Sequence, residues 1–311
     1  MTTFLVLTFA LVFTYALAGY MFNVHYGFTG LINLGIAGFF ALGAYTTAIL
    51  TTPPTETRFA GETYKVGFGM PVWVGVLAAA VVAAVVAFIV GVIALRSVTG
   101  EHLAIMTLGF AEIIRFVAIN EAWLTRGPMG IMGIPRPFSG LWQGIPYILI
   151  LFGTLLLVYF ICERLRISPL GRVLRGIRAD DLAVESLGKN ILNFRLVSFT
   201  SGALFGGMAG AFWAHFTGAI QPQDFSPTLT FLVASSVIVG GEGNNKGVVI
   251  GTATVVGLLY QAPRFLPKIG NPWTIPSARF IVIGLLIILI LRFRREGIIP
   301  KKLVQLEQEA S

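Results

Sequence analysis

The sequence predicts an all-α fold: a polytopic integral membrane bundle of about nine helical segments that forms one transmembrane domain over residues 1–311. Hydrophobic residues make up 56% of the chain and charged residues only 12%, whereas about a quarter of a typical soluble domain is charged. The mean hydropathy is +0.83. Several apolar runs approach the roughly 20 residues that a helix needs to cross a bilayer. Because hydrocarbon cannot satisfy backbone N–H and C=O groups, such runs must be helical.

Four runs without Asp, Glu, Lys or Arg are the firmest membrane segments: Thr2 to Phe22, Gly27 to Leu50, Val72 to Leu95 and Leu196 to Ile220. The first contains a short stretch that resembles a signal-peptidase site. No basic residue precedes it, so we expect it to remain as a membrane helix. The complete set of predicted segments is 2–22, 27–50, 72–95, 103–118, 146–162, 196–220, 229–241, 247–262 and 280–291.

Two of these segments are short for a full membrane crossing. Residues 229–241 and 247–262 are separated by a glycine-rich turn from Gly240 to Gly247. The alternative to two crossings is a pair of half-helices in a broken or re-entrant element, which membrane proteins tolerate where the backbone is buried in protein.

The positions of the basic residues predict the orientation. Of the 22 Lys and Arg residues, seven lie within 163–195 and five within the tail 292–311. By the positive-inside rule both segments are cytoplasmic. This orientation places the C-terminus in the cytoplasm, the N-terminus outside, and the loop 263–279 outside despite its three basic residues. A net charge of +8 could indicate a nucleic-acid partner in a soluble protein, but here the distribution of the charge matters more than its size. We expect a multi-pass protein of the cell membrane with no nucleic-acid partner.

Small and polar residues inside the apolar runs have two interpretations, helix packing or a translocation path. Gly202, Gly206 and Gly210 recur every four residues and would let another helix approach closely. Asn33 and His215 are suited to hydrogen bonds between helices or to solute contacts. Glu112 and Arg115 are spaced i, i+3, so they would meet on one helix face, as a gate or as a self-neutralising pair.

The cytoplasmic segment 163–195 is too patterned for a simple connector. Ser168 and Pro169 predict the start of a short amphipathic helix. We expect its apolar residues to form one face and Arg172, Arg175 and Arg178 to line another. Asp180 or Asp181 would cap a second helix that runs through Leu187, with Gly188 in its C-terminal turn. The segment could form a docking surface for a protein that pushes on the membrane helices, or it could rest on anionic lipid.

The run Arg178 to Gly188 resembles the coupling loop of ABC-importer permeases, although the literal Glu-Ala-Ala triplet is absent. The runs Gly30 to Thr46, Gly100 to Arg115 and Gly127 to Pro135, and the turn Gly240 to Gly247, are similar in the same order to the M-type permease of branched-chain amino acid importers. The resemblance covers roughly residues 10–293.

This resemblance implies a subunit that imports branched-chain or other hydrophobic amino acids. It also implies three kinds of partner: a second related permease, two ATPase subunits and an extracytoplasmic solute-binding protein. The coupling loop would then be the ATPase docking site. Its candidate residues are Ser168, Arg172, Arg175, Asp180, Asp181, Glu185 and Gly188.

The sequence lacks the residues of a nucleotide site or a catalytic centre. No G-x-x-x-x-G-K-[ST] loop occurs, so ATP would be bound by the partner subunits and this chain carries no cofactor of its own. The three histidines are scattered, which predicts no metal site. No Ser, His and acid set has motif support, so we expect no enzymatic activity. The alternatives are an ion-coupled carrier or channel for a small solute such as urea or an amide, and a structural subunit of a membrane enzyme complex.

Overall fold

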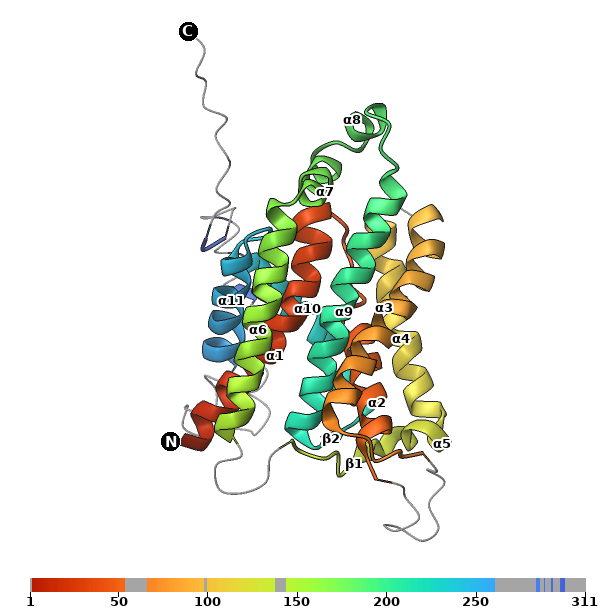
Figure 1. Cartoon of the computed structure of the whole chain (residues 1–311), viewed down its shortest axis with the longest axis vertical. Helices are drawn as coiled ribbons and strands as arrows, with labels where there is room; N and C mark the ends of the chain where they lie inside the picture. The colour runs from red at the N-terminus through yellow and green to blue at the C-terminus, as the bar shows by residue number, and fades with distance from the viewer. Residues whose placement is uncertain are drawn as a thin grey trace.

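The computed structural model describes residues 2–53, 66–97, 100–137, 144–260 and 297–299, together with residues 284, 285, 288 and 292. Within these residues the chain is a bundle of helices (Figure 1), which confirms the predicted all-α membrane fold. Five of the described helices are long and apolar enough to cross a membrane: α1 (Thr2–Phe22, continued by the π-helical η1, Asn23–Phe28), α3 (Val72–Ser97), α4 (Glu101–Asn120), α6 (Gly144–Ile167) and α9 (Ile191–Thr217).

Two shorter apolar helices, α2 (Ile36–Thr51) and α10 (Pro227–Gly240), lie among the long ones. The remaining elements are α5 (Ala122–Thr125), η3 (Gly127–Met129), β1 (Ile131–Met132), α7 (Pro169–Ala179), α8 (Asp181–Ser186), β2 (Ala219–Ile220), η4 (Pro222–Phe225), α11 (Asn245–Thr252) and η5 (Ala253–Tyr260). Most of the predicted segment 280–291, the whole loop 263–279 and most of the tail 292–311 lie outside the described residues.

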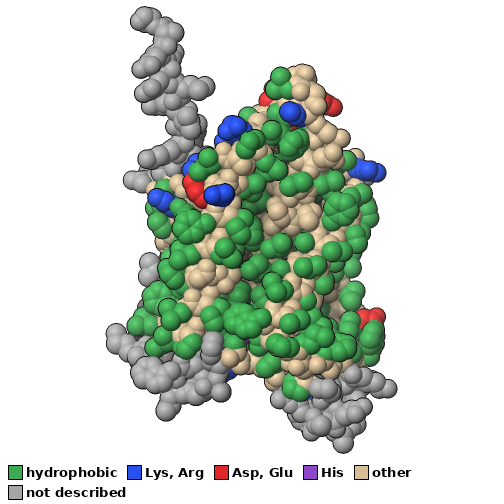
Figure 2. Space-filling model, in the orientation of Figure 1, with side chains coloured by type: hydrophobic (Ala, Val, Ile, Leu, Met, Phe, Trp, Pro, Cys, Tyr) green, Lys and Arg blue, Asp and Glu red, His purple; other side chains and the backbone are tan. Residues whose placement is uncertain are grey.

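The two ends of the bundle differ in character. Helices α7 and α8 form one end, whereas the start of α1, α5 and the antiparallel pair β1–β2 lie at the other (Figure 1). Charged side chains gather at the α7–α8 end, and hydrophobic side chains cover most of the flank (Figure 2). This distribution is what a membrane-crossing bundle requires, because its flank faces hydrocarbon and one of its ends is strongly charged.

The predicted helix over residues 27–50 is wrong in one respect: it is broken. The first membrane helix continues through η1, residues 30–35 are non-helical, and α2 begins only at Ile36. Side chains of neighbouring helices replace the missing helical hydrogen bonds. Leu34 N donates to Thr107 Oγ1 at 3.0 Å and Ala37 N donates to Thr230 Oγ1 at 3.1 Å. The break is stable because its polar backbone is satisfied within protein.

The two short predicted segments near the end of the described chain form a helical hairpin. Added Cβ atoms show how close α10 and α11 are: at Gly240 the Cβ would lie 1.9 Å from the Gly247 carbonyl oxygen, and at Gly251 it would lie 2.0 Å from the Ser236 carbonyl oxygen. Only glycine permits this backbone contact. The hairpin is therefore a pair of tightly packed short helices, and its turn lies near α7.

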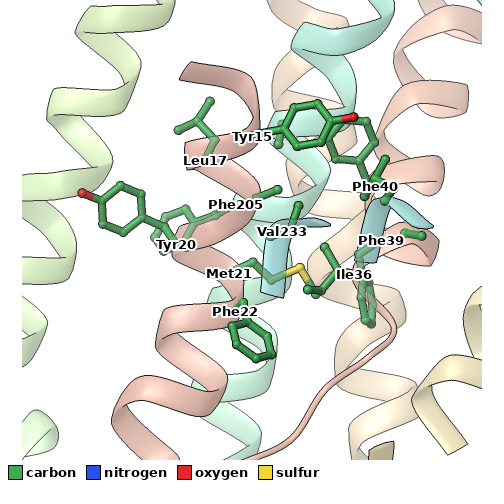
Figure 3. Close-up of a cluster of buried hydrophobic side chains, with 14 of the residues drawn as sticks. Tyr15, Leu17, Tyr20, Met21, Phe22, Ile36, Phe39, Phe40, Phe205 and Val233 are labelled. Atoms are coloured by element: carbon green, nitrogen blue, oxygen red, sulfur yellow. The ribbon is translucent and has the colours of Figure 1, made fainter. Parts of the chain in front are cut away.

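The core of the bundle lies where α1 and α9 meet the two short helices. Aromatic and aliphatic side chains from all four converge there (Figure 3). The labelled members are Tyr15, Leu17, Tyr20, Met21 and Phe22 of α1, Ile36, Phe39 and Phe40 of α2, Phe205 of α9 and Val233 of α10.

Candidate coupling site and polar groups of the bundle

Helices α7 and α8 form a compact element between α6 and α9. The Ser168 Oγ accepts a hydrogen bond from Gly171 N at 3.1 Å, and Asp180 Oδ1 accepts one from Leu182 N at 2.9 Å. These are the predicted N-caps. Gly188, beyond the end of α8, has a φ of +73°, which glycine adopts without strain. Because α6 extends to Ile167 and α9 begins at Ile191, the element occupies residues 168–190, fewer than the predicted 163–195.

The apolar residues of this element are divided between an anchored face and an exposed tip. Leu174, Ile177 and Val184 are buried and fix α7 and α8 against the bundle. Leu182 and Leu187 are each 76% exposed at the tip. These two leucines are the exposed large apolar residues of an otherwise charged and polar tip.

The predicted docking residues occupy the outer surface of the same element. Arg172, Arg175, Asp180 and Glu185 are exposed. The Arg175 guanidinium donates to the Arg166 carbonyl oxygen at 2.5 Å. Partial burial of the Arg175 side chain lowers its pKa from the ordinary value, and the neighbouring charges of Arg166 and Arg172 lower it further. Asp181 forms an ion pair with Arg195, which connects α8 to the first turns of α9.

Arg178 does not belong to this outer surface, and its predicted place beside Arg172 and Arg175 is wrong. It turns inward, forms an ion pair with Glu242 in the α10–α11 turn, and donates to the carbonyl oxygen of Gly27. Its guanidinium carbon lies 5.4 Å from the centre of the Tyr26 ring. Helical periodicity could not reveal this placement because the two hydrogen-bond partners lie 64 and 151 residues away along the chain.

A polar network beside Arg178 joins three further elements. The Asn245 side-chain amide donates to Glu163 of α6 at 2.8 Å, and the Asn23 side-chain amide donates to Asn245 Oδ1 at 3.1 Å. Tyr20 donates to the Asn245 carbonyl oxygen at 2.8 Å. Asn23 also accepts from the backbone N–H of Gly243 at 2.7 Å. The turn of the hairpin is therefore bound to both α1 and α6.

Two buried histidines connect elements in the same manner. His25 Nε2 bonds to the Phe199 carbonyl oxygen at 2.9 Å, so it is the protonated nitrogen, and Nδ1 accepts from Asn33 at 3.0 Å. His215 bonds through Nδ1 to the Pro135 carbonyl oxygen at 2.7 Å and through Nε2 to Thr47 at 2.9 Å. Within the described part of the chain, no three metal-binding side chains gather at one point.

The glycine strip of α9 lies against α1, η1 and α2. An added Cβ at Gly202 would meet the His25 ring at 2.3 Å, at Gly206 the Met21 sulfur at 2.4 Å, and at Gly210 the Phe40 carbonyl oxygen at 1.9 Å. Such short distances are typical of close helix packing, in which a small residue at each crossing point lets the neighbouring helix approach.

The pair Glu112 and Arg115 lies near the middle of α4 and outside the buried core. Glu112 is the twelfth of the 20 residues of α4, which places it about 16 Å along the helix from Glu101 at 1.5 Å per residue. The Arg115 Nε donates to Glu112 at 2.9 Å, and the side chains are 25% and 27% exposed. Charges at membrane depth face protein or water rather than lipid.

We expect the single replacements Glu112→Gln and Arg115→Gln to lower the melting temperature more than the double replacement does. Each single change leaves one charge without its partner, whereas the double change removes both charges. Thermal unfolding of the detergent-solubilised variants measures this order. A double variant less stable than either single variant would show that the charges have separate roles.

Comparisons with known proteins agree with this architecture. Residues 4–291 match the family model described as "Branched-chain amino acid transport system / permease component". The chain is 32% identical over 319 aligned residues to the high-affinity branched-chain amino acid transport system permease protein LivM of Salmonella typhimurium, with 94% of this chain and 69% of the relative covered.

Two more distant relatives extend the comparison. A probable branched-chain amino acid transport permease protein LivM of Methanocaldococcus jannaschii is 27% identical, with 93% of this chain and 91% of the relative covered. The guanosine ABC transporter permease protein NupQ of Bacillus subtilis is 24% identical, with 60% and 59% covered. No solved structure shows a significant match.

Proposed function

The chain belongs to the family of branched-chain amino acid ABC transport permeases, and we propose that it conducts branched-chain amino acids into the cell as half of a two-permease pathway. In this proposal the second half is a related permease, two ATPase subunits supply the energy, and an extracytoplasmic binding protein delivers the solute. The names of the relatives support the substrate class.

The observation that carries the coupling role is the exposed apolar tip of α8. Leu182 and Leu187 are held outside the bundle by an element whose own core, Leu174 and Ile177, is buried. A soluble ATPase could cover these leucines while the surrounding charged groups set its orientation. We assign Ser168, Asp180 and Gly188 to shaping this surface and Arg172, Arg175, Asp181 and Glu185 to its polar rim.

The basic residues of the α7–α8 element support the proposed orientation of the protein in the membrane. Charged side chains gather at the α7–α8 end (Figure 2), and Arg164, Arg166, Arg172 and Arg175 lie within or next to this element. By the positive-inside rule this end is cytoplasmic. The start of α1 then lies outside, at the end where the binding protein would deliver the solute.

The docking assignment predicts that Leu182→Asp together with Leu187→Asp lowers copurification of the ATPase at least tenfold. Two desolvated apolar contacts would be replaced by charges that resist burial. The measurement is the ratio of ATPase to permease after affinity purification of the tagged permease from cells that express both.

Met129→Asp is the matched control, because Met129 is 66% exposed and lies in η3, near the opposite end of the bundle. It should leave the ratio unchanged. Equal ATPase recovery from the double leucine variant and the wild type would refute the docking assignment. Uptake of labelled leucine and guanosine by liposomes that hold the complete complex would test the substrate class.

A further inference from the structure

Arg178 connects the α7–α8 element both to η1 and to the turn of the α10–α11 hairpin. Its Nη1 group binds the Gly27 carbonyl oxygen, at the end of η1, and its Nη2 group binds Glu242, at the turn of the α10–α11 hairpin. The side chains of Arg178 and Glu242 are only 21% and 30% exposed. The contact is therefore enclosed, unlike those at the docking tip.

The backbone of Arg178 is also close to the start of the broken segment. A Cβ added at Gly30 would lie 3.2 Å from Cγ and 3.7 Å from Cα of Arg178. Gly30 has a φ of +75° and begins the non-helical stretch that leads to α2. A displacement of α7 would therefore press directly on the chain that enters the bundle at this break.

The two elements that Arg178 holds are themselves joined deeper in the bundle. Glu242 follows α10, and Gly27 precedes the stretch that leads to α2. The first turns of α10 and α2 meet where the Ala37 N–H donates to Thr230 Oγ1 at 3.1 Å. The Arg178 guanidinium thus connects α7 to η1, which leads to α2, and to the turn that follows α10. One hydrogen bond then joins α2 to α10.

The planar guanidinium suits this position. It presents its donors in a fixed fork, so one residue can bind a carbonyl oxygen and a carboxylate at a set distance from each other. A lysine ammonium is a single point charge on a flexible stem, and it cannot hold two acceptors in the same geometry.

We infer that Arg178 is a positioning residue that transmits movement of the ATPase-docking element to α2 and to the α10–α11 hairpin. This inference rests on the proposed function. Docking itself uses the exposed tip at Leu182 and Leu187, so docking and transmission are carried by different residues. Loss of Arg178 should uncouple ATP hydrolysis from transport while the ATPase stays bound.

The test uses the complete complex in liposomes and measures labelled leucine taken up per ATP hydrolysed. Arg178→Ala should lower this ratio at least tenfold, while ATPase copurification stays within about twofold of the wild type. Arg178→Lys should give an intermediate ratio. Arg96→Ala, an exposed arginine at the end of α3, is the control and should keep the wild-type ratio.

Glu242→Gln provides a second test of the inference. If Arg178 acts through Glu242, the double variant Arg178→Ala with Glu242→Gln should have the same ratio as Arg178→Ala alone, because the pathway is already broken. A merely structural role would instead lower the yield of assembled complex and leave the ratio of the surviving complex unchanged.

Several outcomes would overturn the inference. A wild-type ratio for Arg178→Ala would do so, as would loss of ATPase binding in that variant. If Arg178→Ala does not assemble, a wild-type ratio of leucine uptake to ATP hydrolysis for Arg178→Lys would also overturn the inference. Failure of the proposed function is distinguishable, because the wild-type complex would then bind no ATPase or take up no leucine.

Discussion

Gly210→Val is expected to prevent the formation of a stable folded protein. A Cβ at this position would lie 1.9 Å from the Phe40 carbonyl oxygen and 2.9 Å from the Ala44 nitrogen, both in the backbone of α2. Side-chain rotation moves neither the Cβ of residue 210 nor the backbone atoms of α2. To relieve this clash, α9 and α2 must separate. Overpacking typically costs about 1–3 kcal/mol and occasionally more, and contact with backbone atoms places this case at the upper end.

The measurement is the fraction of detergent-solubilised protein that elutes as a single species in size-exclusion chromatography, together with its melting temperature. Gly153→Val is the matched control. It makes the same change in a membrane helix, α6, where an added Cβ meets no atom within 4 Å. Similar behaviour of the two variants would show that helix propensity, rather than the α9–α2 contact, controls the result.

The second large effect is expected for Asn33→Leu, which replaces a buried amide by an apolar side chain of similar size. Asn33 Oδ1 accepts from Gly35 N at 2.7 Å, and its Nδ2 group donates to His25 at 3.0 Å. The substitution would orphan the Gly35 N–H and the His25 Nδ1. Each buried unsatisfied group costs about 1–3 kcal/mol, so we expect a loss of about 2–6 kcal/mol.

Thermal unfolding of purified Asn33→Leu against the wild type tests this expectation. Asn193→Leu is the control, because Asn193 is exposed near the start of α9. We expect little change there. If Asn33→Leu unfolds at the wild-type temperature, the Asn33–His25 contact does not hold the break between η1 and α2 in place.

The elements that could be predicted depend on local physics. Ser168 and Pro169 begin α7 and Asp180 caps α8, because capping joins a side chain to backbone groups only a few residues away. Long uncharged runs such as 72–95 become helices because hydrocarbon leaves the backbone no other hydrogen-bond partner. Neither outcome depends on distant parts of the chain.

The break before α2 could not be predicted for the opposite reason. Residues 27–50 form an apolar run without charges, and nothing in the run itself requires an interruption at 30–35. The interruption is stable because Thr107 accepts a hydrogen bond from the Leu34 N–H within it, and Thr230 accepts one from the Ala37 N–H at the start of α2.

The sequence by itself determined the membrane location, the long helices and the two capped helices of the α7–α8 element, since composition, segment length and capping act locally. Only the tertiary structure decided which arginine of α7 faces inward, which apolar residues of the element remain exposed, and which glycines lie at helix crossings. Arg178 shows the reason: its place is set by Glu242 and Gly27, whose positions depend on how the entire bundle packs.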